Sequence, residues 1–522
     1  MSWGGAALAL ALAALLVVRL RTLLTYFQQE EYDAARFAAA IGRVRLYDVT
    51  ASAALLATAA LGLLSPLFNW LGAAALLAIA WRERGYRYKK PLVMTERARR
   101  IYAVALALMV VPAGLAALSP LIGVAAVQAA PLALLAANAA LQPLQDRINR
   151  RFQDAAKAKL ARLDPVRIGI TGSFGKTTVK HILAEMLEVS GPVFYSRGSI
   201  NTVLGLTRHI RQRLQWGHRY FVAEMGAYGI GSIRRLSRFV EPDYGIVTAV
   251  GDAHTERFGS VENIAIAKCE LPEAVVSKGG HAVIAQQVMA FEPFRRIKAA
   301  HPDSITTVGR ETQADVVIER AELTQGVWDV TLHDTRDGTR LSYQFPLLGE
   351  HNVMNSALAT VMALKVDPEI AQRLPLVTKD VEQIPHRLQK REARGQPLVL
   401  DDAFNSNETG FRNAITVLSH LAKERGGRAI LVTPGIAELG IEHERVHATL
   451  GRECNDLCDA VYVVNPDRIP TFVAALDRGR VEVHEAPSLR DARRALEART
   501  APEDVVLYEN DLPDLLEERR LL

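Results

Sequence analysis

A glycine-rich segment at 169–178 carries the residues best suited to chemistry, and it reads Gly-Ile-Thr-Gly-Ser-Phe-Gly-Lys-Thr-Thr. An apolar run over 166–170 precedes it, and a helical pattern over 179–189 follows it. A strand that leads through such a loop into a helix predicts a phosphate-binding loop, because N–H groups at the helix N-terminus cradle phosphate. We expect Lys176 to reach the terminal phosphates of a nucleotide and the Thr177 hydroxyl to bind Mg²⁺. The residues expected to line the phosphates are Gly172, Ser173, Phe174, Gly175, Lys176, Thr177 and Thr178.

Two side chains further along the chain lie where a parallel sheet would present them. Glu224 ends the apolar run 221–224, and His254 follows the strand-like segment 244–250. In an open α/β sheet, ligands bind at the edge formed by the carboxyl ends of the strands. We therefore expect both side chains at the same edge of the sheet as the glycine-rich loop.

The elements that must position these residues alternate between strand-like and helical segments from 166 to about 276. Such βαβ patterning predicts a parallel sheet. Residues 304–346 are richer in valine, threonine and short alternations, so an antiparallel stretch is expected there. The charged segment 379–394 is expected to be a hinge between two domains. A second α/β unit begins near Pro397, with strands expected at 398–401, 429–433, 460–464, 481–483 and 505–508.

The first 150 residues have the character of a membrane protein. The second and third of their apolar runs are joined by Leu64-Ser65-Pro66-Leu67, and the fourth and fifth by Leu118-Ser119-Pro120-Leu121. This arrangement predicts two repeated hairpins with tight turns at the membrane surface. The apolar runs, each near the length that spans a bilayer, cover 4–18, 49–64, 67–81, 101–118 and 121–141.

The positions of basic residues predict one orientation for these five spans. Lys and Arg gather at 19–45, 82–100 and 147–151, and the cytoplasmic loops of membrane proteins carry such an excess. Both Ser-Pro turns would then lie outside, and everything after about 150 would lie in the cytoplasm. The prediction is a multi-pass membrane protein whose site-bearing domains are cytoplasmic.

Composition and charge exclude several classes of protein. The net charge of +5 is modest, and the basic loop at 82–100 is flanked by apolar runs. This loop therefore indicates membrane topology, and no nucleic-acid partner is expected. Three cysteines do not suggest a disulfide framework. No Asp, Glu, Lys, Arg or His lies in the central parts of the four hairpin runs, which argues against a transporter.

Further motifs follow in order along the soluble half. Together with the loop, Glu224 and His254, they resemble the Mur ligase family over roughly residues 166–450. The most similar branch is the one that adds D-alanyl-D-alanine to muramoyl-tripeptide. The motifs that carry the resemblance are Gly198-Ser-Ile-Asn201, Ala267-Lys268, Gly349-Glu-His351-Asn352-Val-Met-Asn355, Pro385-His-Arg387, Asp401-Asp402-Ala-Phe-Asn405-Ser-Asn407 and Ala437-Glu438-Leu439-Gly440.

The resemblance implies a fold and an activity. A transmembrane α-helical domain at 1–150 would precede a central P-loop ATPase domain at 163–385 and a C-terminal Rossmann-like α/β domain at 386–522. The activity would be ATP-dependent amide ligation, in which a carboxylate becomes an acyl phosphate that an amine then attacks. Because two anions must meet in the first step, positive charge from Mg²⁺ and from Lys176 would have to screen them.

The resemblance also implies roles for individual residues. Catalysis would depend on Lys176, Glu224, His254 and Lys268. Two Mg²⁺ ions would be held by Thr177, Glu224, His254 and a carbamylated Lys268. Outside the loop, the residues on the ATP side would be His351, Asn352, Asn355, Arg387, Asp402 and Asn405.

Two departures from the family limit what the resemblance implies about substrates. The family's N-terminal domain, which binds the UDP of a sugar-peptide substrate, is replaced by the membrane-like region. The branch also has a Lys-Gly-Ser-Arg segment after its last strand, where this chain reads Tyr508-Glu509-Asn510-Asp511. Acids there would repel a free carboxylate and attract an amine, unless they lie in a solvated C-terminal turn. The candidate substrate residues of the soluble half are Asn201, Glu438, Glu509 and Asp511.

A further candidate contact lies in the membrane half. Lys89 and Lys90, with Tyr86 and Tyr88 beside them, could bind the phosphate headgroup of a lipid-linked substrate. The alternative is that the charges of this loop only set the topology.

The sequence thus predicts a membrane-embedded, ATP- and Mg²⁺-dependent ligase that couples a carboxylate to an amino acid or another amine. The substrate would be lipid-linked or part of the cell envelope. A poly-γ-glutamate synthetase-like ligase is an alternative, since it also joins a membrane anchor to a Mur-like core, although it would need fewer spans. A membrane ATPase coupled to transport or signalling is a second alternative, without an ABC-type signature in its favour. A non-catalytic scaffold is a third, and the retained Lys176, Thr177, Glu224 and His254 argue against it.

Overall fold

The structure, a computed structural model, describes residues 2–43, 48–86, 88, 90–251, 258–324, 327–403, 406–437, 439–497 and 499–511. The chain divides into two compact units, one that extends to Asn149 and one that comprises Arg150–Asp511. The first unit has a core of apolar side chains from helices, whereas the second is built on two sheets.

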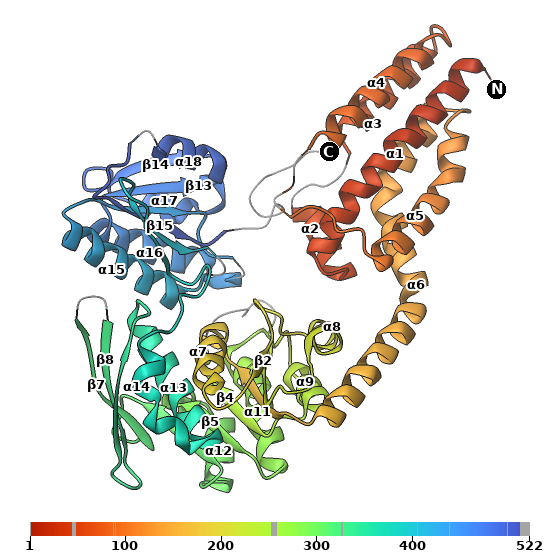
Figure 1. Ribbon diagram of the computed structural model, residues 1–522. Coiled ribbons are helices and arrows are strands. Elements are labelled where there is room, and N and C mark those ends of the chain that lie inside the picture. Colours follow the sequence, from red (N-terminus) through yellow and green to blue (C-terminus); the bar gives the residue numbers. More distant parts are fainter. Residues whose placement is uncertain are drawn as a thin grey trace. The chain divides into compact units, whose positions relative to one another are not determined.

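The first unit is helical in the ribbon diagram (Figure 1). Side-chain hydroxyls cap the N-termini of two of its helices. Ser2 Oγ accepts a hydrogen bond from Gly5 N at 3.1 Å, and Thr95 Oγ1 accepts one from Ala98 N at 3.2 Å. Both predicted Ser-Pro turns lie between helices. The helices are α1 (Trp3–Gln29), α2 (Ala34–Arg43), α3 (Thr50–Gly62), α4 (Phe68–Arg84), α5 (Glu96–Leu115) and α6 (Pro120–Leu163).

Two helices continue beyond the apolar runs that predicted them. The predicted run 4–18 lies within α1, which continues through Arg19, and the predicted run 121–141 lies within α6, which continues to Leu163. Arg19 is 2% exposed and forms ion pairs with Asp48 and Glu83. Basic residues mark the ends of apolar runs, but a backbone can stay helical past them because its hydrogen bonds do not depend on side-chain polarity.

Among the described residues, α1, α5 and α6 are long and apolar enough to cross a membrane. The helix α3 is apolar but has 13 residues, and α4 has 17, whereas about 20 residues are needed to span the hydrocarbon core. Three of the five predicted spans are therefore matched in length and composition within this part of the chain. Insertion into a membrane stays a prediction.

The second unit begins with a mixed sheet. Within the described residues it has nine strands in the order β2-β3-β1-β4-β5-β6-β7-β8-β9. Neighbouring strands are parallel from β2 to β7 and antiparallel from β7 to β9, so the predicted parallel sheet is confirmed. The antiparallel stretch predicted for 304–346 is confirmed for β7–β9 and is wrong for β6, which is parallel to both of its neighbours. The strands are β1 (Val166–Thr171), β2 (Val193–Tyr195), β3 (Tyr220–Glu224), β4 (Tyr244–Val247), β5 (His281–Ala285), β6 (Ile305–Gly309), β7 (Val316–Thr324), β8 (Val327–Asp334) and β9 (Arg340–Phe345).

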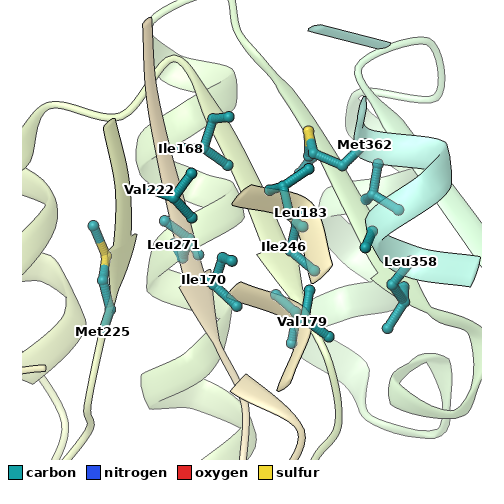
Figure 2. Packing of buried hydrophobic residues seen from close by; sticks show 14 of the residues in the cluster. Ile168, Ile170, Val179, Leu183, Val222, Met225, Ile246, Leu271, Leu358 and Met362 are labelled. Carbon is teal, nitrogen blue, oxygen red and sulfur yellow. The ribbon is translucent and has the colours of Figure 1, made fainter. Parts of the chain in front are cut away.

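Apolar side chains of β1 and two helices form the centre of the core of this sheet. Figure 2 shows Val179 and Leu183 of α7 between Ile168 and Ile170 of β1 and Leu358 of α13. All five side chains are fully buried. The helices that accompany the sheet are α7 (Lys176–Glu188), α8 (Val203–Arg213), α9 (Ser232–Val240), α11 (Val261–Ser277), α12 (Glu292–Ala300), α13 (Glu350–Val366) and α14 (Leu374–Thr378), with 3-10 turns η1 (Gln286–Ala290) and η2 (Pro368–Gln372).

Two glycines let α11 approach the other face of the sheet closely. Because alternate residues of a strand point to opposite faces, Gly169 faces away from Ile168 and Ile170. A Cβ atom on Gly169 would lie 2.9 Å from Leu271 of α11, and one on Gly245 of β4 would lie 3.2 Å from the same leucine. The missing side chains thus leave the space that α11 occupies.

A second sheet forms the last part of the chain. Within the described residues it has six strands in the order β10-β11-β15-β12-β13-β14, all parallel except β10, which is antiparallel to β11. The strands are β10 (Gln389–Arg391), β11 (Leu398–Asp402), β12 (Ala429–Thr433), β13 (Ala460–Val464), β14 (Glu482–Ala486) and β15 (Val505–Glu509). The helices are α15 (Glu408–Arg425), α16 (His443–Leu457), α17 (Pro470–Ala475) and α18 (Leu489–Glu497), with 3-10 turns η3 (Gly440–Glu442) and η4 (Pro466–Arg468).

All five strands predicted for this domain are present. The prediction of a hinge at 379–394 is wrong for its last part, since Gln389–Arg391 is the strand β10. Its charged side chains do not prevent pairing, because an edge strand needs backbone partners on one side alone and can leave its side chains in water.

We expect Gly169→Val to destabilise the second unit by about 1–3 kcal/mol, the usual cost of overpacking a close-packed core. Even the Cβ atom would lie 2.9 Å from Leu271 and 3.0 Å from Met225. Denaturant unfolding measures the loss. The matched control is Gly229→Val, because nothing lies within 4 Å of a Cβ at that position. Equal stability of the two variants would show that α11 is not packed against β1 in this way.

Candidate active site

The glycine-rich loop connects β1 to α7, and two of its residues have to be glycine. Gly172 has a φ of +153° and Gly175 a φ of +81°. A Cβ atom on Gly172 would lie 1.9 Å from Thr248 Oγ1, and one on Gly175 would lie 2.4 Å from Asn355 Oδ1. Both distances are too short for any side chain. The loop can therefore pack against Thr248 and Asn355 only if positions 172 and 175 are glycine.

The segment after β4 holds the rest of the loop. Ser173 N donates a hydrogen bond to Ala249 O at 2.8 Å, and Ser173 Oγ donates to Gly251 O at 3.1 Å. Thr248 Oγ1 donates to Phe174 O. The loop is therefore fixed by bonds to its own protein, and its shape does not depend on a bound phosphate.

Lys176 lies at the first position of α7 with its ammonium over the loop. Its Nζ donates to Gly172 O at 2.6 Å and to Ser173 O at 3.2 Å. Burial lowers the pKa of Lys176 to about 8, although Glu224 acts in the opposite direction. The side chain remains a cation at neutral pH. Since charged phosphate oxygens are stronger acceptors than carbonyls, this ammonium is available to a phosphate placed in the loop.

Glu224 at the end of β3 is the point where predicted residues from three segments meet. It is 1% exposed. Its Oε2 accepts from Thr177 Oγ1 at 2.9 Å and from Lys180 Nζ at 3.1 Å, and its Oε1 accepts from Asn201 Nδ2 at 3.2 Å. Burial alone would raise the pKa of Glu224, but Lys180 and Lys176 outweigh it and hold the pKa below its ordinary value. The site therefore contains an ionised carboxylate.

Lys180 is a site residue that the sequence analysis missed. It is fully buried, and besides Glu224 it donates to Gly198 O. It follows Lys176 by four residues, which places both lysines on one face of α7. A signal was present in the sequence, because a lysine on the buried face of a helix needs an anion beside it. Lys180 thus connects α7 to the end of β3 and to the 198–201 turn.

Lys268 lies in α11 and is 4% exposed. Burial, and secondly the charge of Lys176, lowers the pKa of Lys268 well below its ordinary value. No carboxylate of the described residues offsets this shift. Burial therefore favours the neutral amine, which is the form that can attack CO₂. This environment suits the predicted carbamylation, which stays a prediction.

Three predicted ATP-side residues lie at the start of α13. Burial lowers the pKa of His351 to about 4, so its ring is neutral, and its Nδ1 lies 3.3 Å from Asn413 Nδ2. Asn355 Nδ2 donates to Asn352 Oδ1 at 2.9 Å, and both asparagines are buried. Because Asn355 also lies against the glycine-rich loop, the start of α13 is part of the same site.

The second sheet contributes a pair of carboxyl groups near Arg387. Asp402 and Glu509 are register partners at the ends of β11 and β15, and Ser406 Oγ donates to Glu509 Oε1 at 2.5 Å. Burial, and then the neighbouring carboxyl, raises the pKa of Glu509 well above its ordinary value. Burial also raises the pKa of Asp402, although Arg387 opposes it. Burial thus favours protonation of one carboxyl of the pair.

The burial of Glu509 decides between two interpretations of the C-terminal segment. Glu509 is 1% exposed, so it does not lie in a solvated turn, whereas Asp511 is exposed. Asn510 has a φ of +66°. Its Nδ2 donates to Gly435 O at 2.7 Å. A polar side chain thus fixes the backbone just after the carboxyl pair.

Some predicted residues lie elsewhere. Lys90 is an exposed residue of the first unit, and Thr178 is buried in α7. Among the described residues, no group of three or more His, Cys, Asp or Glu side chains could hold a metal ion. Thr177 and Glu224 do offer oxygen donors, the ligand type that Mg²⁺ prefers. Four predicted residues lie outside the described part of the chain: Lys89, His254, Asn405 and Glu438.

Comparison with protein families identifies this arrangement. Residues 170–363 match the profile of the Mur ligase middle domain, and residues 386–508 match that of the Mur ligase glutamate ligase domain. The chain belongs to the Mur ligase family. The predicted resemblance is confirmed, and it extends further than expected, since the second match continues past 450 to 508.

Individual relatives of this Mur ligase point to one branch. The UDP-N-acetylmuramoyl-tripeptide–D-alanyl-D-alanine ligase of Mycobacterium bovis is 31% identical over 309 residues, which are 58% of this chain and 58% of that protein. A MurF structure from Acinetobacter baumannii has a TM-score of 0.58 at 25% identity and covers 71% of this chain and 81% of its own. The Thermotoga maritima MurF ligase in complex with ADP shares the fold, with a TM-score of 0.59 at 24% identity and coverage of 70% and 80%. This Mur ligase thus spans under two thirds of the curated relative's length.

We expect Lys180→Met to lower the free energy of unfolding by about 3–5 kcal/mol, because Glu224 would remain buried without its cation. Denaturant unfolding measures this loss. Lys159→Met is the control, since Lys159 Nζ donates to the backbone carbonyls of Ile210 and Arg211, each at 3.0 Å. Its loss leaves no buried carboxylate without a cation. The double variant Lys180→Met/Glu224→Gln should recover much of the loss. Strictly additive losses would contradict the ion pair.

Proposed function

We propose that this Mur ligase is an ATP-dependent amide ligase that activates a carboxylate as an acyl phosphate and couples it to an amine. It would act on the cytoplasmic side of a bacterial plasma membrane, with residues 1–150 in the bilayer, 163–385 as the ATP-binding domain and 386–522 as the C-terminal domain. The carboxylate would belong to a lipid-linked or cell-envelope precursor, and the amine to an amino acid or another small molecule. The names of the relatives support a ligase of cell-wall precursors.

One observation carries the proposal. The Thr177 hydroxyl donates to the Glu224 carboxylate at 2.9 Å, directly after a phosphate-binding loop that ends in Lys176. Hydroxyl and carboxylate oxygens beside such a loop are suited to a nucleotide with Mg²⁺. A second ion would need further ligands, of which a carbamate on Lys268 would supply oxygen and His254 a ring nitrogen.

The first step would transfer the γ-phosphoryl group of ATP to a carboxylate oxygen of the substrate, with ADP leaving. Lys176 would donate hydrogen bonds to the phosphoryl oxygens and so stabilise the charge that develops on them. Bound Mg²⁺ would neutralise further negative charge. Glu224 would keep its orientation through Lys180 and Asn201, because those two bonds do not involve Thr177.

The second step would form the amide bond. The amine nitrogen attacks the carbonyl carbon of the acyl phosphate, phosphate leaves with the electron pair of the broken C–O bond, and the nitrogen loses a proton. Asn201 would contribute to substrate recognition from its place beside Glu224, where it also accepts a hydrogen bond from the Tyr228 hydroxyl at 3.2 Å.

The choice of amine would depend on the C-terminal segment. The segment that holds Glu509 and Asp511 replaces a basic segment of the family branch, and a free amino-acid carboxylate would be disfavoured near it. Because Glu509 is buried against Asp402 and Ser406 and burial raises its pKa, we expect it to support this segment through its hydrogen bond with Ser406, and the negative charge that repels a carboxylate to come from Asp511. The exposed Asp511 could contact the substrate directly. Lys89 and Lys90 remain proposed contacts for an anionic lipid-linked substrate.

The activity is tested by product release. A ligase should release ADP and phosphate only when a carboxylate and an amine are both present, and the phosphate should equal the amide formed. Candidate carboxylates are cell-envelope precursors extracted with the membrane, and candidate amines are amino acids and dipeptides. Unconditional ATP hydrolysis would instead support a membrane ATPase.

We expect Lys176→Ala to reduce ATP turnover by about 10²-fold or more, because one lost contact to developing transition-state charge has an effect of this size. The variant should still be found in the membrane fraction in the same amount. Lys159→Ala, a lysine outside the loop, should turn over ATP normally. Near-normal turnover by Lys176→Ala would contradict the assignment of this loop.

We expect Lys268→Ala to be inactive and to be partly rescued by added short carboxylates, which can place an oxygen where the carbamate would lie. The control Lys278→Ala should stay active, since Lys278 caps the end of α11 with its side chain 42% exposed. Isotopically labelled bicarbonate should give a carbamate signal in the NMR spectrum of the unmodified protein and none in Lys268→Ala. Full activity of Lys268→Ala in CO₂-free buffer would refute the role of Lys268.

A further inference from the structure

The first unit contains a hollow of about 320 Å³ between α1, α2 and α6. Most of its lining is apolar, but Arg19, Asp48 and Gln128 also face it. Binding sites for small molecules combine such apolar walls with a few polar groups, and they begin at about 300 Å³. The polar groups of this hollow therefore indicate what it could bind.

The first of these groups is a hydrogen-bond donor. Arg19 and Asp48 are 2% and 4% exposed, and Arg19 Nη1 pairs with Asp48. Arg19 Nε donates to Glu83 Oε2 at 2.9 Å, whereas Nη2 makes no hydrogen bond to the described residues. The N–H groups of Nη2 can thus donate to a ligand in the hollow. Because one cation faces two carboxylates, the cluster also carries an excess of negative charge.

The second group is a pair of acceptors on α6. Pro131 has no N–H, so the carbonyl of Val127 lacks its helical partner, and both residues line the hollow. Gln128 Nε2 donates to Asp48 O at 2.7 Å and to Ser52 Oγ at 2.8 Å, which leaves Gln128 Oε1 as an acceptor. An unsatisfied backbone carbonyl is costly at membrane depth unless the cavity beside it is filled by a polar partner.

We propose that this hollow binds the headgroup of a zwitterionic lipid that carries a phosphodiester and a primary ammonium, as phosphatidylethanolamine does. A phosphodiester oxygen would accept from Arg19 Nη2. The ammonium would donate to Val127 O and Gln128 Oε1, where the excess negative charge favours a cation. The acyl chains would follow the apolar surface of α6 past Leu132, which is 64% exposed. This inference rests on the proposed membrane location and not on the ligase activity.

Three lipids distinguish this headgroup from related ones. Native mass spectrometry of the full chain in detergent, with equal amounts of phosphatidylethanolamine, phosphatidylcholine and phosphatidylglycerol, measures which lipid stays bound. One phosphatidylethanolamine per chain is expected, with about tenfold preference over phosphatidylcholine, whose ammonium has no N–H to donate. Phosphatidylglycerol, which has no ammonium, should also bind about tenfold more weakly. Equal binding of the three would overturn the proposal.

Two variants test the location of the site. Gln128→Leu should remove most of the preference for phosphatidylethanolamine, and Leu132→Trp should reduce the binding of the lipid by obstructing the hollow. The control Leu108→Trp changes a leucine of α5 that is 46% exposed and does not line the hollow, so it should bind as the unmodified chain does. Unchanged preference in Gln128→Leu would refute the site. An alkaline wash that removes the chain from membranes would refute the membrane location itself.

Discussion

A carboxylate buried at the end of a strand must be surrounded by donors, and Glu224 sets this requirement for the second unit. Its partners come from α7 and from the 198–201 turn, so these segments have to meet at the end of β3. Leaving such a group unpaired would cost several kcal/mol, more than most single apolar contacts contribute. Hydrophobic packing holds α7 on the sheet, but the charge of Glu224 fixes which residues of α7 lie at its edge. The position of Lys176 over the loop follows from that alignment.

The parts of the fold that could be predicted are those whose signal is local. Strands β12 and β13 have the predicted bounds because each is a short apolar run between turns. The antiparallel strand β10 was missed, since one polar and two charged residues at a sheet edge carry no such pattern. The residues of the site could likewise be predicted only where their signal is local. Lys176 and Thr177 are recognisable from their spacing, whereas the burial of Lys180 and Glu509 depends on partners that are distant in sequence.

In the first unit, too, contacts between residues distant in sequence could not be predicted, and there the contacts are between charged groups. Asp48 and Glu83 lie 29 and 64 residues from Arg19, so no window of sequence reveals that the three charges form one buried cluster. The sequence suggested a basic residue that marks the end of an apolar span. In the folded unit the same arginine is enclosed by helices and neutralised by two acids. Its role is thus in the interior of the unit, where its effect on neighbouring groups is not screened by water.

The order of the second sheet has a consequence for how the chain is made. The strand β15 lies between β11 and β12, although it is the last strand of the described chain. During synthesis, β11 and β12 leave the ribosome long before β15, and until then each has an open edge that could pair with another chain. The carboxyl pair at Asp402 also stays incomplete, since the bond from Ser406 to Glu509 closes a loop of 103 residues. Folding of this domain has to wait for residues 505–509, and a nascent chain would depend on chaperones for that interval.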